Sequence, residues 1–190
     1  PRSDAYLNDL RRSKGSEVIY KGMPVREILR ALKQGRIVGI LSDQDGGKNG
    51  CFVPFFGRSS SYPKGAASFA MRTGAPILTT FIFREGLMNY RIEVEGPLLV
   101  PDTALSNEEG EQMIFAQFAN IMDEKIRMAP DQWLWAHRRW KSTPDRFVVV
   151  LSDGKAGHLN QSLVLYDAIL RQRLTEGHPE GTTHLKVIEV

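Results

Sequence analysis

The stretch that decides the fold is Gly39-Ile-Leu-Ser-Asp-Gln-Asp-Gly-Gly-Lys-Asn-Gly-Cys-Phe-Val-Pro-Phe-Phe-Gly-Arg58. An apolar run from Ile37 to Leu41 stops at two carboxylates, Asp43 and Asp45, and a glycine-rich loop follows. Loops at strand ends often carry ligand contacts in α/β proteins, because a rigid scaffold holds them. An ordinary solvent-facing Asp/Gly turn is the alternative interpretation, since such turns are common.

The flanking residues predict an α/β fold. Residues 36–42 are apolar enough for a strand inside a sheet. Ahead of them, Pro24 opens a helix that Gly35 closes. Behind the loop we expect a helix over residues 63–72, a second buried strand over 76–83 and an edge strand over 90–95. Ser106 and Glu109 form a predicted capping box for a helix that runs to about residue 128.

A new pattern starts after residues 142–145, which we interpret as a linker. Residues 146–151 predict a strand, residues 152–158 a glycine loop, and residues 159–174 a helix, with a last strand from His184. This order is one βαβ unit, the start of a second, Rossmann-like α/β domain. We therefore expect two domains, at residues 1–142 and 143–190.

Composition limits the possible functions. The 190 residues are 42% hydrophobic with a net charge of +3, which suits anionic ligands or a membrane surface but is too weak to indicate nucleic acid. One cysteine and four scattered histidines predict no disulfide and no metal site. No cofactor is expected, and no apolar run approaches the ~18 residues that span a bilayer. Because the chain starts without Met and stops inside a predicted strand, we expect a piece of a longer protein.

The segment from Gln132 to Lys141 combines three tryptophans with four basic or imidazole groups. Such a segment can lie at a membrane interface, with rings in the headgroup layer and cations on lipid phosphates. The alternative is a helix that packs its Trp rings on the domain and leaves a solvated basic edge.

Two loops carry side chains that could do chemistry. The carboxylates of Asp43 and Asp45 could orient a base, hold a cation or bind hydroxyls, and the glycines Gly46 and Gly47 let backbone N–H groups face an anion. The loop at residues 152–158 resembles a phosphate cradle but lacks the Walker spacing. No catalytic triad is apparent in the sequence.

Five segments together resemble the C-terminal half of the bacterial lipid A biosynthesis acyltransferases of the lauroyl and myristoyl type. In family order over residues 1–142, they are Asp43–Gly47, Val53–Arg58, Thr73–Pro76, Tyr90–Glu95 and Gln132–Lys141. The resemblance implies an αβα acyltransferase-type sheet with flanking helices, incomplete here, at the cytoplasmic face of the bacterial inner membrane. It also implies transfer of a fatty acyl chain from acyl carrier protein to a hydroxyl of a glycolipid.

The family's catalytic base is the His of an H-x4-[DE] motif that lies upstream of everything in this chain. His184 and Glu189 have that spacing by coincidence, across a predicted strand, so we expect this piece alone to be inactive. By the resemblance, Asp43 and Asp45 orient the base or the acceptor, and Arg11 binds phosphate or the thioester oxygen. The remaining substrate-binding residues that it implies are Gly46, Gly47, Phe55, Phe56 and Arg58, with the rings walling an acyl groove and Arg58 meeting the headgroup.

Residues 146–190 are similar to the first βαβ unit of the mitochondrial-fission ELM family, which is glycosyltransferase-like. The motif is Ser152-Asp-Gly-Lys-Ala-Gly-His-Leu-Asn-Gln161. It implies a sugar-nucleotide-binding domain whose candidate ligand residues are Asp153, Gly154, Gly157 and His158.

Two other functions remain open from the sequence. The chain could belong to a non-catalytic lipid-binding module that keeps the groove without the chemistry. It could also belong to a sugar-nucleotide- or phosphate-binding enzyme centred on residues 152–158, with the first part as a scaffold.

Overall fold

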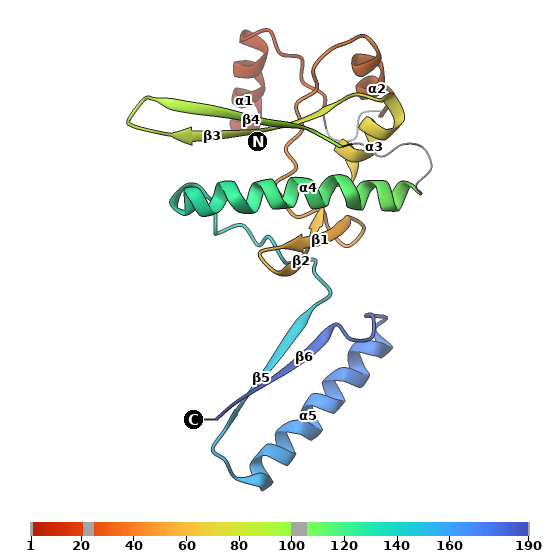
Figure 1. Ribbon diagram of the computed structural model, residues 1–190, viewed down its shortest axis with the longest axis vertical. Helices are drawn as coiled ribbons and strands as arrows, with labels where there is room; N and C mark the ends of the chain where they lie inside the picture. The colour runs from red at the N-terminus through yellow and green to blue at the C-terminus, as the bar shows by residue number, and fades with distance from the viewer. Residues whose placement is uncertain (1, 21–24, 100–105, 190) are drawn as a thin grey trace. The chain divides into compact units, whose positions relative to one another are not determined.

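The computed structural model describes residues 2–20, 25–99 and 106–189 as a mixed α/β fold (Figure 1). The chain forms two compact units, residues 1–42 with 64–118, and residues 43–63 with 119–190. The elements, in chain order, are α1 (Arg2–Ser13), α2 (Val25–Lys33), β1 (Cys51–Phe55), β2 (Arg58–Tyr62), α3 (Gly65–Thr73), β3 (Ile77–Arg84), β4 (Tyr90–Leu98), α4 (Asn107–Met128), a 3-10 turn (Pro130–Gln132), β5 (Arg146–Ser152), α5 (Ala156–Thr175) and β6 (Thr183–Glu189).

In the first unit, α2 and α3 confirm two of the predicted helices, and α1 precedes them. α1 ends with Arg11 and Arg12 in its last turn, where cations oppose the negative end of the helix dipole. α3 ends at Gly74, whose φ of 71° is left-handed and whose N–H donates to the carbonyl of Ala70. The predicted start of α2 at Pro24 lies outside the described residues.

The two strands of the first unit form an antiparallel hairpin in which β3 faces β4. β3 was expected to be buried, and that prediction is wrong, because its residues alternate between buried and exposed. Ile82 pairs with Ile92, and both side chains are exposed on one face of the hairpin.

The predicted buried strand over residues 36–42 is also wrong. Those residues form no strand, the side chain of Ile37 is fully exposed, and Leu41 is exposed as well. Residues 17–20 likewise form no strand. Within the described residues neither segment has a neighbouring strand, and a strand needs a partner for its backbone hydrogen bonds.

The capping box at the start of α4 is confirmed. Glu109 accepts hydrogen bonds from the backbone N–H and the hydroxyl of Ser106, and its own N–H returns a bond to that hydroxyl. The apolar side of the helix buries Ile114 and Met122, as its spacing predicts.

The second unit contains a hairpin, β1–β2, that the sequence analysis did not anticipate. Phe55 pairs with Arg58, so two residues make the turn. Phe56 and Gly57 both have positive φ, of 50° and 72°, which is the backbone of a tight type I′ hairpin turn.

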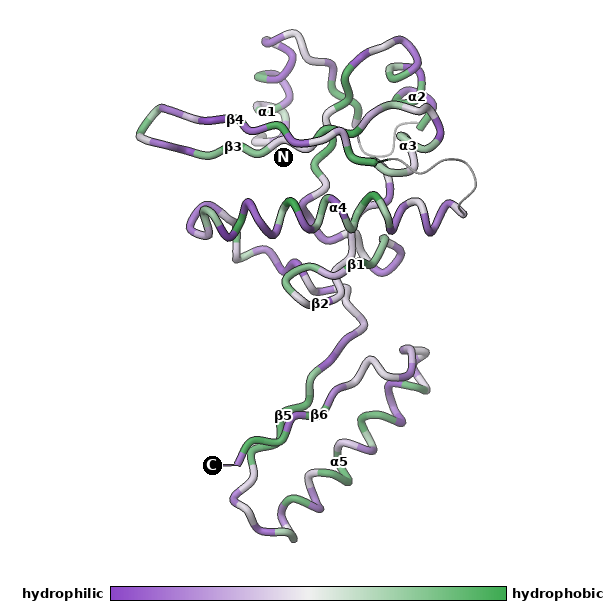
Figure 2. The backbone as a smooth tube through the Cα atoms, in the orientation of Figure 1, coloured by the Kyte–Doolittle hydropathy of each residue, from purple (hydrophilic) through white to green (hydrophobic). Residues whose placement is uncertain are grey.

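Residues 146–189 form a βαβ unit, as predicted. β5 and β6 run parallel in register, with Phe147 beside His184 and Val150 beside Val187, and α5 lies alongside them (Figure 1). Figure 2 shows the hydrophobic run along β5. Within the described residues the strands pair as three two-stranded sheets, so the acyltransferase-type sheet and the full Rossmann-like domain stay predictions.

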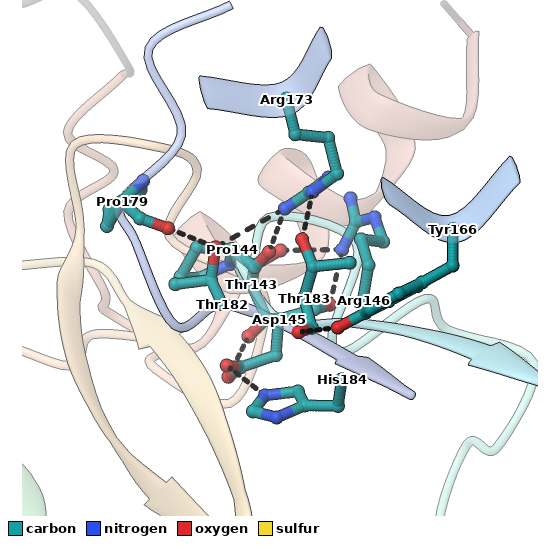
Figure 3. A network of polar contacts seen from close by, with 10 residues as sticks. All are labelled: Thr143, Pro144, Asp145, Arg146, Tyr166, Arg173, Pro179, Thr182, Thr183 and His184. Carbon is teal, nitrogen blue, oxygen red and sulfur yellow. Dashed lines mark hydrogen bonds and ion pairs between the residues drawn. The ribbon is translucent and has the colours of Figure 1, made fainter. Parts of the chain in front are cut away.

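The expected linker at residues 142–145 is held by polar contacts (Figure 3). Arg173 donates from Nη2 to the carbonyl of Pro144 at 2.6 Å, and His184 Nε2 lies 3.2 Å from Asp145 Oδ1. Thr143 is buried and donates its hydroxyl to Asp145. This junction is therefore part of the fold of the second unit.

Candidate functional site

Asp45 anchors the acidic loop to the end of the tryptophan-rich segment. Its carboxylate accepts the hydroxyl of Ser142 at 2.7 Å, the N–H of Ser142 at 3.2 Å and the N–H of Gly47 at 2.9 Å. Three such bonds occupy both carboxylate oxygens, so Asp45 serves to fix the loop and has little capacity left for a substrate.

A second set of contacts holds the two glycines of the loop against β2. The N–H of Gly46 donates to the carbonyl of Ser61 at 3.1 Å, and the Ser61 hydroxyl donates to the carbonyl of Gly47 at 2.6 Å. A Cβ on Gly46 would lie 2.3 Å from the backbone of Tyr62, so only glycine permits this close approach.

His137 adds a third anchor. Its Nε2 accepts the N–H of Asp45 at 3.1 Å, which requires that this nitrogen carry no proton. The acidic loop is thus held from three sides by residues of its own unit.

Asp43 differs from Asp45 in its surroundings. It is exposed, and it makes no hydrogen bond or ion pair with any residue that the structure describes. The rigid loop therefore presents one free carboxylate, two residues from the anchored one. Sequence reasoning treated the two carboxylates alike, and the structure separates them.

Phe55 lies at the centre of an aromatic cluster. Its side chain is 2% exposed, and its ring contacts those of Phe56, Tyr62, Trp133 and Trp140 at centroid distances of 4.7–6.5 Å. This packing supports the acidic loop through β1 and β2. A role for Phe55 as a groove wall remains a prediction that nothing in this arrangement tests.

The other predicted substrate residues are more accessible. Phe56 is half-buried at the hairpin turn, with its ring against Trp135. Arg58 is exposed, with its guanidinium 5.5 Å from the Trp140 ring centroid. Arg11 is exposed on α1 of the first unit, where it donates to Asn8.

The tryptophan-rich segment is not a helix, contrary to one of its two interpretations. A 3-10 turn at residues 130–132 leads into successive turns. Trp133 and Trp140 pack on Phe55, whereas Leu134 and Trp135 are 71% and 53% exposed. The ring packing of the second interpretation is present at Trp133 and Trp140, although without a helix, and the membrane interface stays a prediction.

Sequence reasoning missed three residues of the anchor, which are Ser61, His137 and Ser142. Two of them lie in or next to the tryptophan-rich segment, whose polar residues were assigned to solvent or lipid. A signal was present in the alternation of rings with single polar groups, because buried polar groups beside rings need specific partners.

The βαβ unit carries the second candidate loop, between β5 and α5. His158 Nδ1 lies 3.0 Å from Asp153 Oδ2, and Gly154 has a φ of 77°. A hydrogen bond from the backbone N–H of Lys155 lowers the pKa of the Asp153 carboxyl, and the contact with His158 lowers it by a smaller amount. Gly157 lies in the first turn of α5. Asp153 and His158 of the predicted ligand loop are thus in contact, and a ligand at this loop stays a prediction.

Two negative observations apply to the described part of the chain. No three His, Cys, Asp or Glu side chains gather there in a way that could hold a metal ion. None of its helices has both the length and the hydropathy to cross a bilayer.

Comparison with known proteins places residues 1–142 in one family, described as the bacterial lipid A biosynthesis acyltransferases. The lipid A biosynthesis palmitoleoyltransferase of Escherichia coli is 32% identical over 127 residues, covering 63% of this chain and 38% of the relative. The lauroyltransferase of the same organism is 22% identical over 141 residues, covering 74% and 45%. A phosphatidylinositol mannoside acyltransferase of Mycobacterium tuberculosis is 33% identical over 82 residues, covering 41% and 26%.

The chain belongs to the bacterial lipid A biosynthesis acyltransferase family. It spans less than half the length of each of these relatives. Both anchoring segments of the acidic loop, residues 43–47 and 137–142, lie inside the matched region.

Proposed function

We propose that the complete protein transfers a fatty acyl chain from acyl carrier protein to a hydroxyl of a lipid A-type glycolipid. The observation that carries this proposal is the anchored acidic loop, which holds Asp45 in three hydrogen bonds and leaves Asp43 free. Membership of the acyltransferase family supplies the reaction class. The names of three relatives, two acting in lipid A biosynthesis and one on phosphatidylinositol mannoside, supply the acceptor class.

Asp43 is the residue to which we assign a direct role. An exposed carboxylate on a fixed loop can accept a hydrogen bond from the acceptor hydroxyl, or from the imidazole that removes its proton. Either contact orients the nucleophile toward the thioester carbonyl. Asp45 acts on the reaction through the loop.

We place the reaction at the cytoplasmic face of the bacterial inner membrane. The support is the surface patch made by Leu134 and Trp135, with the exposed cations Arg138 and Lys141 in the same segment. Trp135 donates its indole N–H to the carbonyl of Pro130 at 2.7 Å, which fixes the exposed ring. Rings flanked by cations suit a layer of anionic lipid headgroups.

The test compares Asp43→Asn with the wild type in the complete protein, with acyl-acyl carrier protein and a lipid A precursor as substrates. We expect kcat to fall about 10²-fold or more, the range for lost acid–base assistance, with little change in stability. An unchanged kcat in the Asp43→Asn variant would show that this carboxylate takes no part in acyl transfer. A wild-type protein that binds the glycolipid without transferring an acyl chain favours the non-catalytic lipid-binding module.

The βαβ unit supports a second candidate function, sugar-nucleotide or phosphate binding at residues 152–158. The observation that favours it is the contact between Asp153 and His158 where β5 ends and α5 begins. Calorimetric titration with a uridine diphosphate sugar tests it. Loss of binding on Asp153→Ala supports this function, and no heat of binding in the wild type rejects it.

A further inference from the structure

Arg139 is a buried cation in the second unit. Its side chain is 1% exposed and lies over two rings, with the guanidinium carbon 4.1 Å from the Tyr62 centroid and 5.5 Å from that of Phe55. No carboxylate of the described residues pairs with it. A buried charge without a counter-ion is strongly unfavourable unless other groups compensate for the lost hydration, so the groups that hold this guanidinium have to be identified.

Arg139 is held by a hydrogen bond to the backbone of β2, at the residue that also contacts the acidic loop. Its Nη1 donates to the carbonyl of Ser61 at 2.6 Å, and the same carbonyl accepts the N–H of Gly46. Ser61 in turn holds the carbonyl of Gly47. A charged donor on one lone pair of a carbonyl fixes and polarises that carbonyl more strongly than a neutral donor does. Arg139 is therefore linked to the acidic loop through Ser61.

We infer that Arg139 is a positioning residue for acyl transfer, which holds Ser61 and thereby fixes the loop that presents Asp43. This inference rests on the proposed function. Arg139 is too deeply buried to touch substrate, so its effect passes through Ser61 and the two glycines. The faces of Tyr62 and Phe55 stabilise the charge without drawing its hydrogen bond away from Ser61.

The first measurement is independent of activity. Hydrogen exchange of residues 43–50 is compared between the complete wild-type protein and the variant Arg139→Met, with Arg171→Met as the control, since Arg171 is exposed on α5. We expect exchange at Gly46 and Gly47 to rise at least tenfold in Arg139→Met and to stay unchanged in the control. Unchanged exchange at these glycines overturns the inference.

The second measurement is a double-mutant cycle with Asp43. Arg139→Met is expected to lower kcat more than tenfold with little change in KM, and to lower it by less than twofold when Asp43→Asn is already present. Equal fold-losses in both backgrounds overturn the inference, because a merely structural role would add independently. A wild-type protein without acyl transfer instead refutes the proposed function, while the exchange result still decides whether Arg139 holds the loop.

Two milder variants keep the test decisive if Arg139→Met does not fold. Arg139→Lys retains a charge but loses the planar group that lies on the rings, and is expected to restore part of kcat. Ser61→Ala removes the hydroxyl bond to Gly47 and leaves the Ser61 carbonyl in place. It is expected to raise exchange in residues 43–50, and unchanged exchange there contradicts the inference.

Discussion

Ser142 donates both its backbone N–H and its hydroxyl to the carboxylate of Asp45, although the two residues lie 97 positions apart in the sequence. This pair joins the acidic loop to the segment that follows the last tryptophan. The loop is also tied to Ser61 and His137, so hydrogen bonds from the protein itself hold its conformation. Pre-organisation of this kind suits a group that must meet a reacting hydroxyl.

The two carboxylates of the loop should respond differently to substitution. Asp45→Asn loses charge-assisted bonds, each worth about 1.5–3 kcal/mol, so we expect the free energy of unfolding to fall by about that much. Asp43→Asn should change it by less than about 0.5 kcal/mol, as exposed positions do. Urea denaturation of the complete protein measures both. Equal destabilisation by the two variants would contradict the division of roles.

Tyr62 should make the protein sensitive to alkali. Burial raises the pKa of Tyr62 to about 12, and the nearby Arg139 opposes part of that rise. Below about pH 10, the pKa of tyrosine in the unfolded chain, the contribution of Tyr62 to folding stability is fully present. Between about pH 10 and pH 12 the unfolded chain ionises first, so stability falls by on the order of 2–3 kcal/mol. Denaturant unfolding as a function of pH measures this loss, and Tyr62→Phe should reduce it.

The exposed patch at Leu134 and Trp135 should contribute to membrane binding. Trp135→Ser and Leu134→Ser are each expected to weaken binding to anionic phospholipid vesicles about tenfold, which corresponds to about 1.4 kcal/mol of buried apolar surface. Leu165→Ser is the matched control, because that leucine is similarly exposed on α5. Cosedimentation with anionic and zwitterionic vesicles gives the affinities. Binding that is unaffected in all three variants would exclude this patch.

Arg173 should stabilise the junction between the matched region and the βαβ unit. Besides its bond to Pro144, it donates from Nε to the hydroxyl of Thr183 at 2.7 Å. Arg173→Met is expected to lower the free energy of unfolding by about 1.5–3 kcal/mol, the range for hydrogen bonds to a charged group. Arg171→Met, two residues away and exposed, should have no effect. Limited proteolysis near residue 144 gives a second readout, and resistance equal to the wild type would refute the role.

Local signals in the sequence predicted much of the secondary structure. Helical spacing and end signals located α3, α4 and α5, and the Ser106–Glu109 pair gave the start of α4. The βαβ order of residues 146–189 was equally readable, because each element follows directly on the one before.

Features that depend on distant partners were not predictable in this way. The apolar run at residues 37–41 looked like a strand, but composition does not show whether another strand lies beside it. The β1–β2 hairpin was missed because its turn, Phe56-Gly57, lacks the usual Asn-Gly signal. Asp43 and Asp45 could not be told apart, since their difference comes from Ser142 and His137, more than ninety residues away.

Phe56 combines an unfavourable backbone conformation with ring contacts to its neighbours. A residue with a φ of 50° is more comfortable as asparagine or glycine, yet a phenylalanine is kept there, beneath the Arg127 guanidinium and against Trp135. The conformational energy lost at this position indicates how much the contacts of the ring must contribute to stability or function. Phe56→Gly should therefore relax the backbone at this turn and remove the ring contacts with Arg127 and Trp135.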